Sequence, residues 1–277
     1  MAKRILGAQA KTTDAVVRGE LGWWTLKGRR DMLRLRYWGK LTRMKSKRWT
    51  RRVYVRSREE FEKGEKTWCT YTHKLLHDLD MEGVWESEET GDKSEWNTRV
   101  FEAIQEREIV MWREQLKSKP KLRTYETIKN ELELELYLSS STNTAGRKIM
   151  SAIRTGSNVL RIETGRYWNP MIPVEERICW CCGEAVEDEK HFVIHCREYD
   201  EERSEMFQAI SRVTDGMFTQ QQLVNTQTDQ LFKMLLGGEI GCNESEVICC
   251  VQTFLVRAMR KRRKFLERAW GVGKGVY

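Results

Sequence analysis

The chain has 277 residues, a formal net charge of +8 and eight cysteines. This length is enough for one large or two modest domains, and 40% hydrophobic residues are enough for a core. No stretch approaches the roughly 20 apolar residues that a membrane-spanning helix needs. Residues 1–17 lack the apolar segment of a secretory signal. We therefore expect a nuclear or cytoplasmic protein that is neither secreted nor embedded in a membrane.

Positive charge is concentrated in two short segments. Residues 27–58 hold fourteen Lys or Arg and one acid, Asp31, which gives a net charge of +13. Residues 257–268 hold seven Lys or Arg and one acid, Glu267, which gives +6. The rest of the chain carries −11. Because each neutralised phosphate releases condensed counterions, this concentration favours a polyanionic partner.

The first long helix is expected over residues 29–48. Its apolar positions recur at helical spacing and are predicted to face the core: Leu33, Tyr37, Leu41 and Met44. Trp38 and Trp49 stand among cations, where aromatic rings can stack on bases while the cations hold phosphates. A core stripe with a solvated charged face explains the same pattern, so both interpretations stay open. The cations predicted to contact nucleic acid are Arg29, Arg30, Arg34, Arg36, Lys40, Arg43, Lys47, Arg48, Arg51 and Arg52.

The whole pattern predicts a mainly α fold, an irregular helical bundle with a small zinc-knuckle module. Residues 1–77 form a basic helical region, and the acidic residues 78–95 are predicted to be a solvated loop. Residues 96–168 are expected to be helical, with one short helix from Thr144 to Thr155. Residues 169–212 contain the zinc knuckle and the helix that follows it, and residues 213–277 form a helical tail.

Four residues in the knuckle have metal-ligand spacing, C-x2-C-x8-H-x4-C: Cys179, Cys182, His191 and Cys196. Two thiolates two residues apart can bind one ion, and a later His and Cys can complete a tetrahedron. Zinc suits this mixed sulfur and nitrogen set best. Four protein ligands leave no open position, so we expect one structural Zn²⁺.

Two neighbouring residues are alternative ligands. His195 follows His191 at H-x3-H spacing and could replace Cys196, whereas Cys181 is the less favoured candidate. A disulfide cluster would need an oxidising compartment, of which the N-terminal sequence gives no sign. The remaining cysteines are expected to be small core residues: Cys69, Cys242, Cys249 and Cys250.

Residues 178–207, ICWCCGEAVEDEKHFVIHCREYDEERSEMF, resemble the C-terminal Cys-Cys-His-Cys zinc knuckle of non-LTR (LINE-type) retrotransposon reverse transcriptases. The family has a Cys-x-x-Cys pair, an acidic stretch, His-Phe, an apolar pair, Cys, Tyr and an Arg-bearing helix. In this chain the later elements are His191-Phe192, Val193-Ile194, Cys196, Tyr199 and Arg203. This resemblance favours Cys196 over His195 as the fourth ligand.

The resemblance extends to residues 153–166, similar to the Arg-rich turn before the knuckle, and to residues 19–44, which look like helices around and beyond the polymerase thumb. It implies a module that holds RNA or DNA during target-primed reverse transcription, with a polymerase domain as a further partner. However, the chain has no Tyr-x-Asp-Asp turn, and residues 204–277 contain no nuclease cluster. We therefore expect no catalytic site and no enzyme activity.

The knuckle is expected to present Trp180, Lys190, His195 and Arg197 to nucleic acid. The alternative is that Trp180 packs on Phe192 as part of the knuckle's own core. Residues 260–264, RKRRK, resemble a nuclear localisation signal and equally fit the solvated end of an amphipathic helix. The competing function is a zinc-stabilised structural or protein-interaction module, or a non-functional fragment of a mobile element. The oligomeric state is left open.

Overall fold

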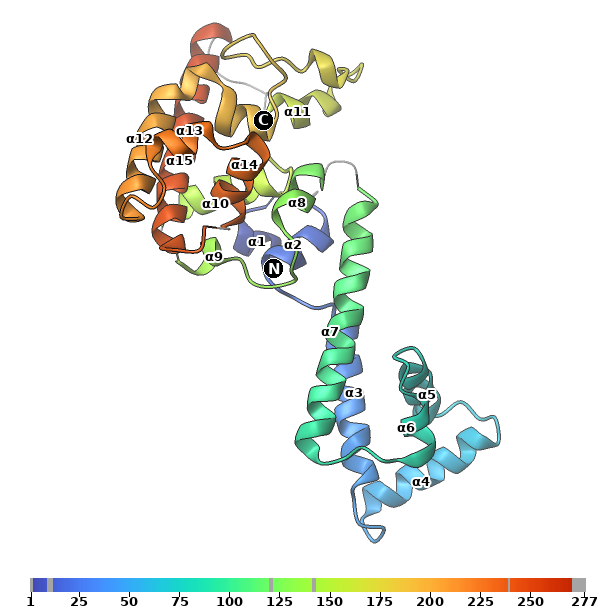
Figure 1. Ribbon diagram of the computed structural model, residues 1–277. Helices are drawn as coiled ribbons and strands as arrows, with labels where there is room; N and C mark the ends of the chain where they lie inside the picture. Colours follow the sequence, from blue (N-terminus) through green and yellow to red (C-terminus); the bar gives the residue numbers. More distant parts are fainter. Residues whose placement is uncertain (1, 9–11, 120–121, 141–142, 239, 271–277) are drawn as a thin grey trace. The chain divides into compact units, whose positions relative to one another are not determined.

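The structure, a computed structural model (Figure 1), describes residues 2–8, 12–119, 122–140, 143–238 and 240–270. The protein is mainly α-helical, and its described residues form isolated β-bridges but no strand, which confirms the predicted fold class. No helix in these ranges has a long enough apolar run to cross a bilayer. The α-helices are α1 (Ala2–Leu6), α2 (Asp14–Glu20), α3 (Leu26–Thr42), α4 (Trp49–Glu62), α5 (Trp68–His77), α6 (Glu82–Ser87), α7 (Lys93–Lys117), α8 (Arg123–Ile128), α9 (Leu136–Ser140), α10 (Thr144–Arg154), α11 (Arg161–Thr164), α12 (Asp200–Val213), α13 (Gln220–Asn225), α14 (Thr228–Gly237) and α15 (Glu244–Trp270). The short turns are η2 (Gly165–Tyr167), η3 (Val174–Glu176), η4 (His191–His195) and η5 (Arg197–Tyr199).

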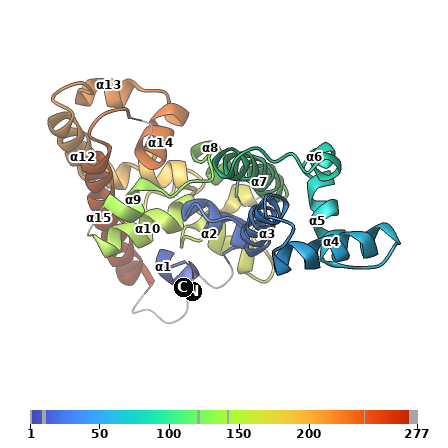
Figure 2. The same ribbon diagram turned by 90° about the horizontal axis from the view of Figure 1, so that it is seen from below.

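The chain divides into two compact units, and the smaller one consists of residues 23–114. The larger one combines residues 1–22 with residues 115–277. These units cut across the five segments expected from the sequence. The reason is that α3 and α7 pack side by side although they are far apart in the chain (Figures 1 and 2).

Three indoles form the centre of the smaller unit. Trp38 of α3 stacks on Trp85 of α6 with ring centroids 5.9 Å apart, and the Trp96 ring of α7 lies 5.4 Å from Trp38. The indole nitrogen of Trp96 also donates to the Leu35 carbonyl oxygen at 2.8 Å. A Cβ on Gly39 would lie only 2.3 Å from the Trp96 ring. Glycine at this position therefore allows α3 and the Trp96 indole to approach each other.

This indole cluster sets the buried face of α3, and the predicted face was wrong in part. Leu41 is buried as expected, but Leu33 is 62% exposed and Tyr37 is 45% exposed. Trp38, for which the sequence left base stacking and core packing both open, is fully buried. Trp38 is buried in place of Leu33 and Tyr37 because the rings of Trp85 and Trp96 pack around it. The helical spacing within α3 gives no information about these two distant residues.

The acidic segment 78–95 is not a solvated loop. It forms α6 and the start of α7, and it buries Val84 and Trp85. Asp92 begins α7, since its side chain accepts hydrogen bonds from the backbone N–H groups of Ser94 and Glu95. Val84 and Trp85 thus help to anchor this acidic segment to the core that contains the indole cluster.

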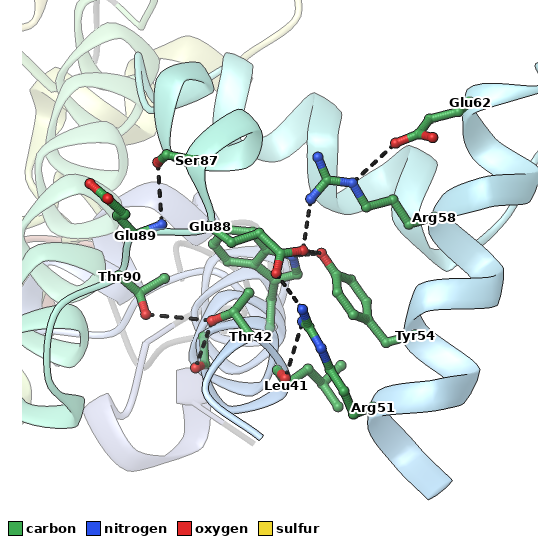
Figure 3. Close-up of polar contacts among 12 residues, drawn as sticks. Leu41, Thr42, Arg51, Tyr54, Arg58, Glu62, Ser87, Glu88, Glu89 and Thr90 are labelled. Atoms are coloured by element: carbon green, nitrogen blue, oxygen red, sulfur yellow. Dashed lines mark hydrogen bonds and ion pairs between the residues drawn. The ribbon is translucent and has the colours of Figure 1, made fainter. Parts of the chain in front are cut away.

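Glu88, which directly follows α6, is the centre of a polar cluster (Figure 3). Its carboxylate accepts hydrogen bonds from Arg51 at 2.6 Å and from Tyr54 and Arg58 at 2.7 Å each. Burial alone would raise the pKa of Glu88, but hydrogen bonds from Arg51 and Tyr54 and the charge of Arg51 outweigh it, so the pKa is lowered. Glu88 therefore ties α4 to the end of α6.

The larger unit packs α10 and α12 against the long helix α15, and α12 lies beside α15 in Figure 2. Helix α10 (Thr144–Arg154) nearly coincides with the helix expected over residues 144–155. Its last residue, Arg154, is fully buried and forms ion pairs at 2.9 Å with both Glu20 and Glu135. Burial opposes the charge of Arg154, but Glu20 and Glu135 raise its pKa above the usual range. A paired arginine thus stands inside the core.

The cysteines outside the knuckle differ in burial. Cys69 is fully buried, as expected for a core residue, and Cys242 and Cys250 are half-buried. Cys249 is exposed, so its prediction as a core residue was wrong. Helix α15 turns Cys249 towards solvent because Val247, Val251 and the next turn supply its buried face.

Candidate metal centre

The four residues with metal-ligand spacing meet in one buried cluster. One ligand atom from each of Cys179, Cys182, His191 and Cys196 lies within 4.8 Å of all the others. The sulfurs of Cys179 and Cys196 are 3.9 Å apart, and the Cys182 sulfur is 3.3 Å from His191 Nε2. Residues up to seventeen positions apart in the sequence thus surround one point, and together they can hold a metal ion.

The first cysteine pair is placed by a tight turn. The Cys179 N–H donates to the Ala185 carbonyl at 2.7 Å, and Ile178 bridges Val186 on the return side. Gly183 closes the turn with φ +71°, a value that side chains with a Cβ rarely adopt. This backbone hairpin directs both thiols to the inside.

The second ligand pair is placed by η4, a single π-helical turn. The Cys196 N–H donates to the His191 carbonyl at 2.7 Å, which spans five residues and brings the two ligands together. Asp188 begins the turn by accepting from the His191 N–H at 2.7 Å. Single π turns frequently mark functional sites, because they place side chains where an α-helix does not.

The two alternative ligands lie outside the cluster. His195 is exposed, and its Nε2 atom is 3.3 Å from the Thr228 hydroxyl. The Cys181 thiol instead accepts a hydrogen bond from the Tyr199 hydroxyl at 3.2 Å. The structure therefore assembles the set with Cys196 and not the set with His195.

The thiols of the cluster and of the neighbouring Cys181 differ in the direction of their pKa shifts. Hydrogen bonds from the Cys181 and Cys196 thiols lower the pKa of Cys179. The pKa values of Cys181 and Cys196 are raised, first by the same hydrogen bonds to Cys179 and then by burial. A bound cation would favour loss of the remaining ligand protons, since metal ions coordinate thiolates.

A buried ion pair stands next to the ligands. Glu187 is fully buried, and its carboxylate accepts from Arg262 of α15 at 2.7 and 2.9 Å and from the Arg161 N–H at 2.8 Å. One Glu187 oxygen is 4.0 Å from the Cys179 sulfur. The sequence did not indicate this pair. Glu187 lies in the acidic stretch between Cys182 and His191, but no residue near it in the chain indicates Arg262 as its partner.

The pair also changes the interpretation of residues 260–264. Arg262 is only 3% exposed, so the basic run is not simply the solvated end of an amphipathic helix. Lys261 pairs with Glu202 of α12 at 3.1 Å. Arg260, Arg263 and Lys264 remain exposed. Two of the five cations thus bind to acids of the same unit.

Arg203 of α12 holds the end of the π turn. It is 6% exposed and donates to the carbonyl oxygens of Val193 at 3.0 Å and Cys196 at 2.9 Å. Phe192, inside the turn, packs on Tyr199 with ring centroids 5.1 Å apart. The candidate metal ligands are therefore held by hydrogen bonds and aromatic packing that do not involve their own sulfur and ring nitrogen atoms.

The other side chains predicted to reach nucleic acid from the knuckle have partners in the same unit. Lys190 pairs with Asp229 at 2.6 Å, and Arg197 pairs with Glu184 at 2.5 Å while remaining 60% exposed. Trp180 is half-buried, and the Arg161 guanidinium lies 4.5 Å from the centre of its ring. Trp180 is therefore covered by a cation of its own unit.

The cations predicted in residues 27–58 lie on α3, α4 and the segment between them, all within the smaller unit. Four of the fourteen form ion pairs: Lys27, Arg51, Arg56 and Arg58. In the described part of the chain, the other ten have no carboxylate within ion-pairing distance: Arg29, Arg30, Arg34, Arg36, Lys40, Arg43, Lys45, Lys47, Arg48 and Arg52. Of the ten cations in this region that the sequence predicted to contact nucleic acid, only Arg51 forms an ion pair with an acidic side chain.

No family model matches this chain, and neither a curated protein nor a solved structure is detectably similar to it.

Proposed function

We propose that this protein binds nucleic acid through the cations of residues 27–58, and that one structural zinc ion organises the knuckle in the other unit. The observation that carries the proposal is the group of ten cations without an acidic partner in the described residues. Unpaired surface cations release counterions from phosphates when a nucleic acid binds. Such contacts give affinity without sequence information, so sequence preference is weak.

The spacing of the ligand atoms supports zinc. A tetrahedral site with Zn–S bonds of about 2.3 Å has S···S edges of about 3.8 Å and S···N edges of about 3.6 Å. The corresponding distances are 3.9 Å for Cys179 to Cys196 and 3.3 Å for Cys182 to His191. All four residues are buried, which suits a closed structural site.

The resemblance of residues 178–207 to a retrotransposon zinc knuckle supports a specific role. In this proposal the module holds RNA or DNA during target-primed reverse transcription, beside a polymerase domain, and performs no chemistry itself. Nuclear residence suits that role.

The second candidate is a structural or protein-interaction module. It is favoured by the ion pairs of the larger unit, where Lys190, Arg197, Lys261 and Arg262 all bind nearby acids. Paired cations contribute less to phosphate binding because the acid must first be displaced. If this second candidate is correct, the unpaired cations of residues 27–58 do not bind a nucleic acid.

Two variants with the same net charge separate the candidates. The test variant replaces four unpaired cations with Gln: Arg30, Lys40, Lys45 and Lys47. The control variant replaces four paired cations with Gln: Lys190, Arg197, Arg257 and Lys261. Affinity for single-stranded RNA and duplex DNA is measured over a range of salt concentrations.

We expect wild-type affinity to fall steeply with salt. The slope of log K against log[salt] is negative, and its magnitude should become smaller by about 0.7 to 0.9 for each phosphate contact that the test variant loses. The control should change the slope by less than one contact. A flat salt response of the wild type, or an equal loss in both variants, would contradict the proposal.

A further inference from the structure

An exposed aromatic cluster lies between α3 and α5 in the smaller unit. Tyr37 of α3 meets the edge of Trp68 of α5, with ring centroids 6.2 Å apart. One turn earlier on α3, the Arg34 guanidinium lies 5.5 Å from the centre of the Tyr71 ring. Tyr37 is 45% exposed and Tyr71 is 62% exposed. We call Tyr37, Trp68, Tyr71 and Arg34 the aromatic platform.

The platform is fixed by the packing of two helices. Arg34 and Tyr37 are three residues apart on α3, and Trp68 and Tyr71 are three residues apart on α5, so each pair shares one side of its helix. The two helices contact each other directly. Trp68 is half-buried, and Cys69 beside it is fully buried, so α5 is held against the core while Tyr71 stays outside. The rings therefore have defined positions, and little conformational entropy is lost when a flat ligand binds.

The exposed charged residues of α3 and α5 that adjoin the platform at helical spacing are all cations, whereas Asp31, three residues before Arg34, is buried and paired with Lys27 and Arg107. On α3 these are Arg30 and Lys40, at four and three residues from Arg34 and Tyr37 respectively. On α5 the next residue on the Tyr71 side is Lys74. All three are exposed, and none has a carboxylate partner in the described ranges. Leu33, which is 62% exposed, adds apolar surface one turn before Tyr37.

We infer that the aromatic platform binds the unpaired bases of a single nucleic-acid strand, with bases stacked on Tyr37 and Tyr71 and phosphates held by Arg30, Lys40 and Lys74. This inference rests on the proposed function and narrows it to single strands at one site. Base faces are accessible only where a strand is unpaired, and every base has such a face, so stacking tolerates any sequence. A duplex would satisfy the cations but would leave the rings without a partner.

The platform also explains why two residues predicted for the core are on the surface. Tyr37 and Leu33 lie outside the buried side of α3 that carries Trp38, among cations that cannot be buried unpaired. Large apolar side chains interleaved with cations combine the two requirements for binding a strand, which are flat surface for bases and positive charge for the backbone.

The test compares three probes of the same length, about 16 nucleotides, which covers the strand length that comparable single-strand sites occupy. They are a thymidine strand, an abasic strand with the same phosphates, and a duplex. The test variant is Tyr37→Ala combined with Tyr71→Ala. Tyr37→Phe combined with Tyr71→Phe keeps both rings, and Tyr167→Ala removes a tyrosine that is 60% exposed in the other unit. Thermal unfolding of each variant checks that folding is retained.

We expect wild-type protein to bind the thymidine strand more tightly than the abasic strand, by about five-fold or more for each stacked base. The double Ala variant should lose this difference while it keeps its affinity for the abasic strand and the duplex. The double Phe variant and Tyr167→Ala should behave like wild type.

Two results would overturn the inference in distinguishable ways. If all three probes bind in a salt-dependent manner and the thymidine strand is not preferred over the abasic strand, the proposed function is supported but base stacking on the aromatic platform is excluded. Absence of binding to every probe, with unaltered folding, would remove both and favour a protein partner. A preference for bases that survives the double Ala variant would place the stacking site elsewhere and also contradict the inference.

Discussion

The two units of this protein use basic side chains in different ways. In the larger unit, Arg154, Arg203 and Arg262 are buried and bind carboxylates or backbone carbonyl groups. In the smaller unit, ten of the fourteen cations in residues 27–58 have no acidic partner among the described residues. A buried cation must be paired to be tolerated, whereas an exposed one contributes little to folding. Charge density in the sequence alone therefore does not distinguish structural cations from those that can bind a ligand.

The largest effect is expected from replacing one of the four clustered residues. If the cluster holds zinc as proposed, Cys179→Ser should release the metal and unfold the knuckle, because the binding energy of a structural zinc, about 10 kcal/mol or more, is folding energy. Metal content by mass spectrometry and hydrogen exchange of residues 174–203 measure both effects. Cys249→Ser is the matched control, since Cys249 is exposed and outside the cluster. Full metal retention in Cys179→Ser would exclude this residue as a ligand.

The next largest effect is expected at the buried ion pair beside the ligands. Arg262→Met leaves Glu187 charged and buried without its main partner, so the free energy of unfolding should fall by about 3 to 5 kcal/mol. Arg263→Met, at the exposed neighbouring position, should change it by about 0.5 kcal/mol or less. Denaturant unfolding gives both values. Similar losses in the two variants would show that the pair has no special importance.

A pH-dependent effect is expected at the polar cluster of the smaller unit. Glu88 has a lowered pKa in the folded protein, so its ionised form contributes stability above its unfolded pKa of about 4.3, and this is lost as pH falls through the folded value. Glu88→Gln should therefore destabilise the protein by about 1 to 3 kcal/mol at pH 7 and progressively less below pH of about 4. Glu89→Gln, at an exposed site, is the control. A pH-independent difference between wild type and Glu88→Gln would contradict this account.

The smallest effect on stability is expected at an unpaired cation. Lys40→Gln should change the free energy of unfolding by about 0.5 kcal/mol or less, since Lys40 is exposed and has no acidic partner in the described residues. Its affinity for RNA should nevertheless fall, and Lys40→Arg should retain it. A large loss of stability would place Lys40 among the structural cations and weaken the contrast between the units.

The sequence was informative where the determinants are local. The ligand set Cys179, Cys182, His191 and Cys196 follows from spacing within eighteen residues, and the structure assembles that set. Helix α10 was likewise predicted to within one residue.

The sequence was misleading where distant residues decide. Trp38 is buried because Trp85 and Trp96 surround it, and they lie 47 and 58 residues further along the chain. The Glu187–Arg262 pair joins residues 75 positions apart. Acidic composition suggested a loop at residues 78–95, but burial of Trp85 outweighs it. In each case tertiary packing selected which of several locally acceptable conformations forms.

Lysine acetylation footprinting with and without bound RNA tests the division between the units most directly. The account predicts that RNA protects Lys40, Lys45 and Lys47 of the smaller unit, whereas the reactivity of Lys190 and Lys261 in the larger unit is unchanged. All five lysines have at least partly exposed side chains, so each can report. Protection of Lys190 and Lys261 without protection of Lys40, Lys45 and Lys47 would contradict the account.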